Sequence, residues 1–510
     1  MKRGAVILIE NGDVYLKIAE IKNQDINILE DQRSSLKPGR DLLKRNKNKC
    51  QVVKELCAII KYYSRIVQEY KVEAVKVVAG GGVGEVLVKD FVQNLIKEKT
   101  GFNVDILDEF QEKNYMFQTI INKFRNNISV RDNEVLISYL SADRLAIGII
   151  AREKVIGCRN FKIDSFKMSE ILNDIKGKTQ DFHKVIKDNF SGLTNALKIF
   201  FEKHQLNCLL ASGRGIKLIA KLCNLRHGRN FYNIPGVKLS SLFKQIKGKT
   251  VEQLEGIYKM STNDAEIILP VVVILRTLVK LSAVKKIITP VVDMEDILIY
   301  KMLFPDKFKA ERKHFIKGAI FSARNIGERY KYNRVHGSLV SEFSISIFEE
   351  LTKKYSFNKK DGLLLEVAAV LHDSGKFLSI ENHSRYSYEI IRNSDITGLK
   401  KREIILTACI AKLHSGQNEE INDYDFKELT LPERIRVAKL TAILRIADAL
   451  NKSHYNKFNQ LKLELNENEL QIRVHTNKET VLEKSVIEKK ARLFEKVFAL
   501  KPVLKSKMIF

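Results

Sequence analysis

The 510-residue sequence contains little proline, glycine or cysteine and no long apolar run. Its 7 Pro and 25 Gly exclude a Pro/Gly-rich disordered or fibrous chain, and 45% hydrophobic residues supply enough apolar surface for several folded cores. The 6 cysteines lack the spacing of metal ligands or of a small disulfide-linked domain, which predicts reduced, mostly buried thiols. The longest apolar run, residues 267–275, is far shorter than the ~20 residues that span a bilayer, so no transmembrane helix is expected.

The N-terminus also lacks the apolar region of a secretory signal. After the basic start at residues 1–3, only six residues precede Glu10. Together with the reduced thiols, this start predicts a cytoplasmic protein.

Acidic residues are outnumbered, with 61 Asp and Glu against 88 Lys and Arg and a formal net charge of +27. This excess favours a polyanionic partner such as polyphosphate, a nucleotide, RNA or an anionic membrane face. A lysine-rich composition that only keeps the surface soluble explains the charge equally well. Charge alone therefore leaves the partner open.

The first 300 residues alternate between strand and helix patterns. Residues 4–9 and 14–18 predict a hairpin, and residues 74–78 predict a buried strand that enters a glycine run at 80–84. Further strand patterns lie at residues 104–107, 135–140, 144–150 and 208–211. The alternation predicts two α/β units, residues 1–125 and 126–310, with a fold class of α/β plus all-α for the whole chain.

Strand patterns disappear at about residue 311, where apolar residues begin to recur in steps of four, as between 335 and 351. This spacing predicts an all-helical domain at residues 311–455. Two strand patterns, at 461–465 and 470–475, and a helix at 480–496 then predict a small α+β domain at residues 456–510.

Six metal-ligand side chains occur at ordered positions in the helical segment. Each predicted helix offers one or two of them beside its apolar stripe: His336, His372, Asp373, His383, His414 and Asp448. A lone histidine at a helix end is usually a hydrogen-bonded structural residue. Their order on successive helices instead favours a shared site.

A mixed set of imidazoles and carboxylates suits a divalent ion, either Mg²⁺, Mn²⁺ or another transition metal, and favours a hydrolytic site over a closed structural one. Such an ion would lower the pKa of a water molecule and neutralise charge on a phosphoryl oxygen. Lys376 or Arg445 would then hold the substrate phosphate. Asp373 and Lys376 are accordingly predicted catalytic residues.

The stretch Leu371-His372-Asp373-Ser374-Gly375-Lys376, with His336 before it and Asp448 after it, resembles the HD superfamily of metal-dependent phosphohydrolases. By this resemblance His336, His372, Asp373 and Asp448 are the core metal ligands. His383 and His414 become candidate ligands of a second metal or contacts to phosphate.

Residues 322–330, just before His336, and residues 444–454 resemble the exopolyphosphatase/guanosine pentaphosphate phosphohydrolase (Ppx/GppA) family. The resemblance implies two actin- and acetate-kinase-like (ribonuclease H-like) lobes, an HD-type helical domain and a small α+β tail. It implies polyphosphate or a phosphorylated nucleotide as the ligand and a homodimer as the assembly. No membrane and no specific nucleic acid is expected as a partner.

The N-terminal lobes depart from the motifs of this family. The position of the family's catalytic aspartate is Leu8, and the stretch that should hold a phosphate-binding arginine reads Ala-Gly-Gly-Gly-Val-Gly at 79–84. The family's glycine-rich second phosphate loop aligns with residues 137–144, where a bulky Tyr-Leu pair prevents the close approach that glycine allows. The family's acidic general-base region aligns with residues 108–112, where Glu112 is the one plausible remaining general base. Glu112 is therefore the predicted catalytic residue of the N-terminal lobes.

Two glycine-containing turns are candidate substrate-binding sites. Gly80, Gly81 and Gly82 form either a structural tight turn or an anion site at a helix start, and their spacing matches no nucleotide-binding fingerprint. Gly213 and Arg214 partly resemble the second-lobe loop of the family, with Arg214 as the phosphate contact.

Three hypotheses follow from these motifs. In the first, the chain is a metal-dependent phosphohydrolase whose chemistry lies in the HD-like domain. The second keeps the family's own reaction, with phosphate released from polyphosphate or guanosine pentaphosphate in the N-terminal cleft. In the third, the chain senses a guanosine polyphosphate or polyphosphate without hydrolysing it.

Overall fold

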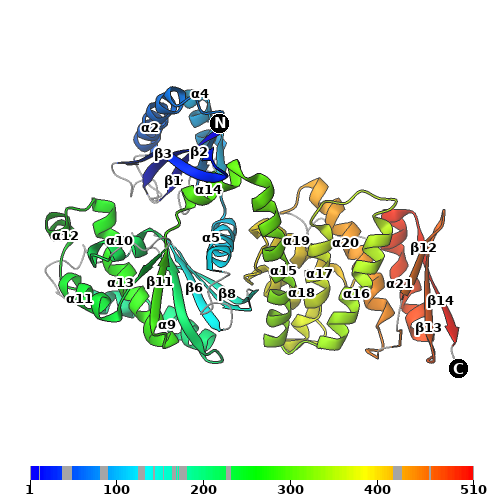
Figure 1. Cartoon of the computed structure of the whole chain (residues 1–510). Helices are drawn as coiled ribbons and strands as arrows, with labels where there is room; N and C mark the ends of the chain where they lie inside the picture. The colour runs from blue at the N-terminus through cyan, green and yellow to red at the C-terminus, as the bar shows by residue number, and fades with distance from the viewer. Residues whose placement is uncertain are drawn as a thin grey trace. The chain divides into compact units, whose positions relative to one another are not determined.

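The computed structural model divides the chain into two compact units, Met1–Ile316 and Lys317–Phe510 (Figure 1). It describes residues 2–10, 12–36, 49–80, 90–124, 133–141, 144–152, 154–163, 168, 171, 181–225, 231–416, 428–455, 457–458 and 461–508. Among these residues no helix is both long enough and apolar enough to cross a membrane. The predicted coarse arrangement, α/β elements followed by helices, is confirmed, whereas the finer boundaries near 125 and 455 stay predictions.

The first sheet of unit 1 has five strands in the order β3-β2-β1-β4-β5. Its strands are β1 (Arg3–Glu10), β2 (Asp13–Lys22), β3 (Asp25–Ser35), β4 (Ala74–Ala79) and β5 (Val104–Ile106). The first three strands are antiparallel, and β4 and β5 then add in parallel. Helices α2 (Lys49–Glu69) and α4 (Asp90–Thr100) supply apolar side chains to the core on one face.

The second sheet repeats this topology in the order β8-β7-β6-β9-β11-β10. Its strands are β6 (Glu134–Leu140), β7 (Arg144–Ala151), β8 (Lys154–Lys162), β9 (Leu206–Ser212), β10 (Phe231–Asn233) and β11 (Lys286–Pro290). Again an antiparallel trio is followed by parallel strands, with the short β10 added antiparallel at the edge. The repeated order is what two related α/β lobes require.

Helices pack against this second sheet and between the two sheets. The sheet's own helices are α8 (Phe182–Asn189), α9 (Ser191–Phe201), α10 (Arg214–Leu222), α11 (Gly236–Ile246), α12 (Val251–Tyr258) and α13 (Thr262–Ser282). A further core includes buried side chains of α5 (Glu109–Phe124) and α14 (Met294–Leu303) together with side chains of both sheets. The two lobes are therefore joined by a continuous apolar core.

Unit 2 is a helical bundle followed by a three-stranded sheet (Figure 1). After α15 (Pro305–Arg329), its helices are α16 (Arg334–Leu351), α17 (Asp361–Leu371), the 3₁₀ turn η1 (Ser374–Phe377), α18 (His383–Arg392), α19 (Lys401–Leu413) and α20 (Leu431–Leu450). The sheet has the order β12-β13-β14, and α21 (Val481–Phe498) packs on both β14 and α20. Its strands are β12 (Leu461–Leu465), β13 (Glu469–Thr476) and β14 (Lys501–Met508).

Five cysteines have described side chains, and all five are free thiols: Cys57, Cys158, Cys208, Cys223 and Cys409. Burial raises the pKa of the Cys409 thiol to about 11. These residues agree with the predicted reduced and mostly buried thiols.

Candidate functional site

Six predicted ligand residues lie together where the helices of unit 2 begin and end. His336 is in the first turn of α16, His372 follows α17, and Asp373 precedes η1. The other three lie at the first residue of α18, directly after α19 and near the end of α20: His383, His414 and Asp448. Five of the six are buried, and His383 is half-buried.

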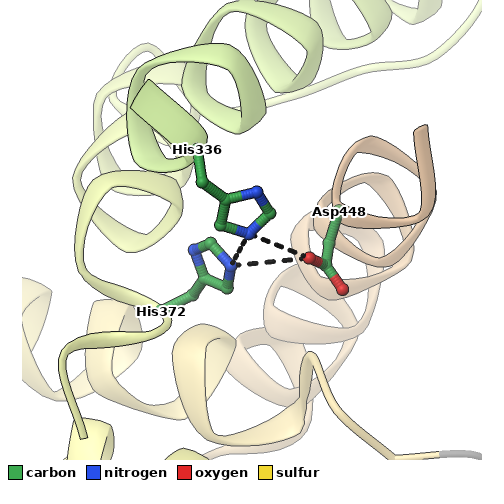
Figure 2. A group of neighbouring side chains, drawn as sticks. All are labelled: His336, His372 and Asp448. Atoms are coloured by element: carbon green, nitrogen blue, oxygen red, sulfur yellow. Dashed lines mark hydrogen bonds and ion pairs between the residues drawn. The ribbon is translucent and has the colours of Figure 1, made fainter. Parts of the chain in front are cut away.

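Four of these side chains lie close together and form a first group. Figure 2 shows His336, His372 and Asp448 pointing toward one another from separate helices. The Nε2 atom of His336 lies 3.3 Å from Nε2 of His372, and 3.4 Å from both Asp373 Oδ2 and Asp448 Oδ1. His372 Nε2 lies 3.6 Å from each of the same two oxygens. Donors at about 2.1 Å from a tetrahedrally coordinated ion are about 3.4 Å apart, so His336, His372 and Asp448 have the spacing of metal ligands, with Asp373 beside them.

A second group uses the other oxygen of the same aspartate. His383 Nε2 and His414 Nε2 lie 3.3 Å apart, and each is 3.7 Å from Asp373 Oδ1. Asp373 therefore presents Oδ2 to the first group and Oδ1 to the second. This arrangement suits a carboxylate that bridges two ions.

All four imidazole rings are held so that Nε2 faces the site. The Nδ1 atom of His372 lies 2.7 Å from the Ala369 carbonyl oxygen, that of His383 2.7 Å from Ile380 O, and that of His414 2.6 Å from Ala411 O. The Nδ1 atom of His336 lies 2.7 Å from Oδ1 of Asn451. Since an acceptor oxygen faces each Nδ1, that nitrogen carries a hydrogen, and Nε2 is the nitrogen that would bind a metal when it carries no proton.

Burial and mutual contacts shift the pKa values of the site in opposite directions. Burial lowers the pKa of His414 to about 4, which favours a neutral ring. Burial would also lower the pKa of His336, but hydrogen bonds to Asp373 and Asp448 raise it to about 9, so an ion that binds at Nε2 would displace a proton from this ring. The histidines and Lys490 hold the pKa of the Asp373 and Asp448 carboxyls well below the usual range despite their burial. Both carboxylates are therefore ionised and able to bind a cation.

The two predicted phosphate contacts of unit 2 lie beside the site in different surroundings. Lys376 Nζ lies 2.5 Å from Asp373 Oδ2 on a side chain that is about one-third exposed. Arg445 is buried, and its Nε donates to the Leu413 carbonyl at 2.9 Å. Lys376 is thus the more accessible cation for a substrate.

Local sequence features position the ligand-bearing elements. The Asn333 side chain accepts a hydrogen bond from the His336 backbone N–H at 3.1 Å, which fixes the first turn of α16. Gly375 lets η1 approach α18 closely, because a Cβ there would lie 2.0 Å from the His383 carbonyl oxygen. The Gly375 N–H also donates to Ser387 Oγ at 2.9 Å. The Ser374-Gly375-Lys376 stretch is therefore a packing motif as well as a source of a cation.

Two supporting residues were not predicted from the sequence. Asn451 follows α20 and contacts His336, while Lys490 of α21 donates to Asp448 Oδ2 at 2.7 Å. Helical spacing offers a signal for Asn451, three residues after Asp448. No comparable signal links Lys490 to Asp448, which lies 42 residues earlier in the chain.

The second predicted region, in unit 1, surrounds a cavity of about 260 Å³ between the two lobes. Gly213 and Arg214 line it, whereas Gly80 and Glu112 are not among its lining residues. The φ angle of Gly213 is +114°, and a Cβ there would lie 2.1 Å from the Leu140 carbonyl oxygen, so the turn requires glycine. Arg214 pairs with Asp13 and, at 2.8 Å, with Asp264.

Glu112 and Gly80 lie against each other, and neither of them lines that cavity. Glu112 is buried, and a Cβ at Gly80 would come within 2.5 Å of its Oε1 atom. The Gly80 N–H donates to the Ile9 carbonyl at 3.0 Å, which leaves it no hydrogen for an anion. Gly81 and Gly82 lie outside the described residues. The structure thus brings the unit 2 candidates together, whereas of the described unit 1 candidates only Gly213 and Arg214 line the cavity.

The cavity of unit 1 contains a buried carboxyl, Glu295, whose burial raises its pKa to about 8. Because the folded state retains this proton above the ordinary glutamate pKa, stability should fall as the pH rises through the interval from about 4.5 to 8. Glutamine does not titrate, so we expect Glu295→Gln to remove this pH dependence of the free energy of unfolding. The variant should therefore gain stability relative to wild type as the pH increases. Urea unfolding at pH 5, 7 and 9 measures this difference, and a pH-independent difference would contradict the assignment.

Comparisons with known proteins agree with the motifs. Residues 17–131 match the sequence profile described as the Ppx/GppA phosphatase family, and residues 320–492 match Ppx/GppA phosphatase, domain III. An exopolyphosphatase structure from Cytophaga hutchinsonii ATCC 33406 is 15% identical, with a TM-score of 0.51 over 59% of this chain and 98% of that one. A Ppx/GppA family member from Aquifex aeolicus is 18% identical, with a TM-score of 0.48 over 60% of this chain and 99% of the other. No curated protein matches the sequence.

The two matched segments together cover more than half of the chain. The resemblance to this family that the motifs predict is therefore confirmed, and the likeness to the Cytophaga hutchinsonii protein shows a shared fold. The attribution of the helical bundle to the HD superfamily, the homodimer and the cytoplasmic location stay predictions.

Proposed function

The chain belongs to the Ppx/GppA phosphatase family, and from this premise we propose that it is a metal-dependent phosphohydrolase whose reaction takes place in unit 2. Membership makes it a hydrolase of phosphoanhydride bonds, as the motifs predict. The observation that carries the proposed location is the pair of ligand groups that share Asp373. The proposed substrate is polyphosphate or a phosphorylated nucleotide.

The donor set favours a transition metal over Mg²⁺. Four imidazole nitrogens and two carboxylates face the site, whereas Mg²⁺ prefers oxygen ligands and retains several waters. His336, His372, Asp373 and Asp448 would hold one ion, and His383, His414 and Asp373 a second. When bound, these ions would activate a water molecule and stabilise negative charge on phosphoryl oxygens.

The remaining residues prepare the site for an anionic substrate. Asp373 and Asp448 keep their charge, and the lowered pKa of His414 keeps its ring neutral. His372 and His414 both turn Nε2 inward, because their Nδ1 atoms face backbone carbonyls. Lys376, on a partly exposed turn, can exchange its contact with Asp373 for a phosphate oxygen, because its side chain reaches solvent. An ammonium group there would orient the terminal phosphate and offset its charge.

Removal of the metal tests the proposal directly. We expect extensive chelation to abolish phosphate release from polyphosphate or guanosine polyphosphates, and readdition of Mn²⁺ or Zn²⁺ to restore it. Elemental analysis should find up to two ions per chain. Full turnover by protein shown to be free of metal would reject the proposed chemistry.

The family reaction in the N-terminal cleft is a second candidate, favoured by the cavity between the lobes. Against it, Arg33 and Arg214 are already engaged by the carboxylates of Asp13 and Asp264, and Glu112 is not among the residues that line the cavity. A ligand-sensing role of the same cavity is the third candidate. Calorimetric binding of a guanosine polyphosphate without product formation would favour the sensor.

A further inference from the structure

Asn451 bridges a metal-ligand candidate and the loop after α20. It is buried, with 2% of its surface exposed, and its Oδ1 atom lies 2.7 Å from His336 Nδ1. Its Nδ2 atom donates to the Tyr455 carbonyl at 3.0 Å. Since the carbonyl accepts only, the NH₂ group must face Tyr455 and the amide oxygen must face His336. Both ends of the amide are thus assigned by independent contacts.

His336 differs from the other three histidines in what holds its ring. The rings of His372, His383 and His414 each donate from Nδ1 to the backbone carbonyl three residues earlier. The carbonyl three residues before His336 is that of Asn333, which accepts the Gly337 N–H at 2.9 Å as α16 begins. His336 therefore depends on a side chain for its Nδ1 acceptor, and Asn451 supplies it.

We propose that Asn451 is a positioning residue that fixes the tautomer and orientation of His336, so that Nε2 faces the ion held with His372, Asp373 and Asp448. This inference rests on the proposed metal site of unit 2. The physical reason is that a ring hydrogen bond to a fixed acceptor keeps hydrogen on Nδ1 and the lone pair on Nε2. Loss of such a supporting contact typically lowers metal affinity ~10–100-fold.

Two substitutions in the full-length chain separate this role from general stability. Asn451→Leu keeps the branched skeleton of the side chain but has no acceptor, and we expect it to weaken Zn²⁺ binding by ~10–100-fold in calorimetric titration. Asn451→Asp keeps an acceptor oxygen for Nδ1–H while losing the donor to Tyr455, so it should bind Zn²⁺ nearly as wild type does. Circular dichroism of each variant confirms that the helices remain folded.

Nitrogen-15 NMR of the Zn²⁺-loaded protein provides a readout that a purely structural role would not change. We expect coordination of His336 through Nε2 in wild type and in Asn451→Asp, and a mixture of Nε2 and Nδ1 signals in Asn451→Leu. Wild-type affinity together with a single Nε2 signal in Asn451→Leu would overturn the inference. If wild type itself binds no Zn²⁺, the proposed metal site fails, an outcome distinguishable from failure of Asn451 alone.

Discussion

Replacing Asp373 by alanine should abolish metal-stimulated phosphate release, because this carboxylate is shared by both ligand groups. Its Oδ2 atom faces His336 and His372, and its Oδ1 atom faces His383 and His414. Stabilisation of phosphoryl charge by a bound ion is worth several kcal/mol, so turnover should fall by roughly 10³-fold or more. Elemental analysis should show that the variant retains neither ion.

Two controls make this result specific to the site. Asp373→Asn retains the size and hydrogen-bonding capacity of the side chain but not its charge, so it should also lose the ions while remaining folded. Glu112→Ala changes the acidic candidate of unit 1 and should leave metal content unchanged. Loss of turnover in Glu112→Ala, with full activity in Asp373→Ala, would assign the reaction to the N-terminal cleft instead.

The helical part of the site could be predicted from the sequence because its ligands lie at or near the ends of helices that the apolar pattern predicts. His372 and His414 directly follow buried apolar helices, α17 and α19, whose directions bring the helix ends together. The lengths and the order of the predicted helices are enough to assign a ligand at a helix end to one end of the bundle. The convergence of these residues agrees with that reasoning.

Residues whose roles depend on tertiary packing could not be predicted. Lys490 reaches Asp448 because α21 packs on α20, an arrangement that no periodicity in either helix specifies. The strands β3, β8, β10 and β11 were also missed. Strand β3, for example, is polar and mostly half-buried or exposed, so it lacks the apolar alternation that marks a buried strand.

The lobes of unit 1 are joined by a ring of four charges, at the place where the family's motifs predict phosphate loops. Asp13 and Arg33 come from the first sheet, and Arg214 and Asp264 from helices of the second lobe. Arg33 lies 3.2 Å from Asp13 and 3.0 Å from Asp264, while Arg214 pairs with the same two carboxylates. Each guanidinium is thus held by two carboxylates. Because Arg33 pairs with Asp264 and Arg214 pairs with Asp13, the ring holds the two lobes together through the protein's own charges.

Asp13 is the member of this ring whose removal should cost the most. Its side chain is fully buried and also accepts from Ser35 at 2.7 Å and from Asn263 at 3.2 Å. Asp13→Ala leaves two guanidinium groups with one carboxylate, and breaking a buried pair in this way typically costs ~3–5 kcal/mol. Asp31→Ala is a matched control, because Asp31 pairs with Lys17 at 3.1 Å from an exposed position, where a pair contributes about 1 kcal/mol or less. Urea unfolding of both variants measures the contrast; equal effects would mean that the ring does not hold the lobes together.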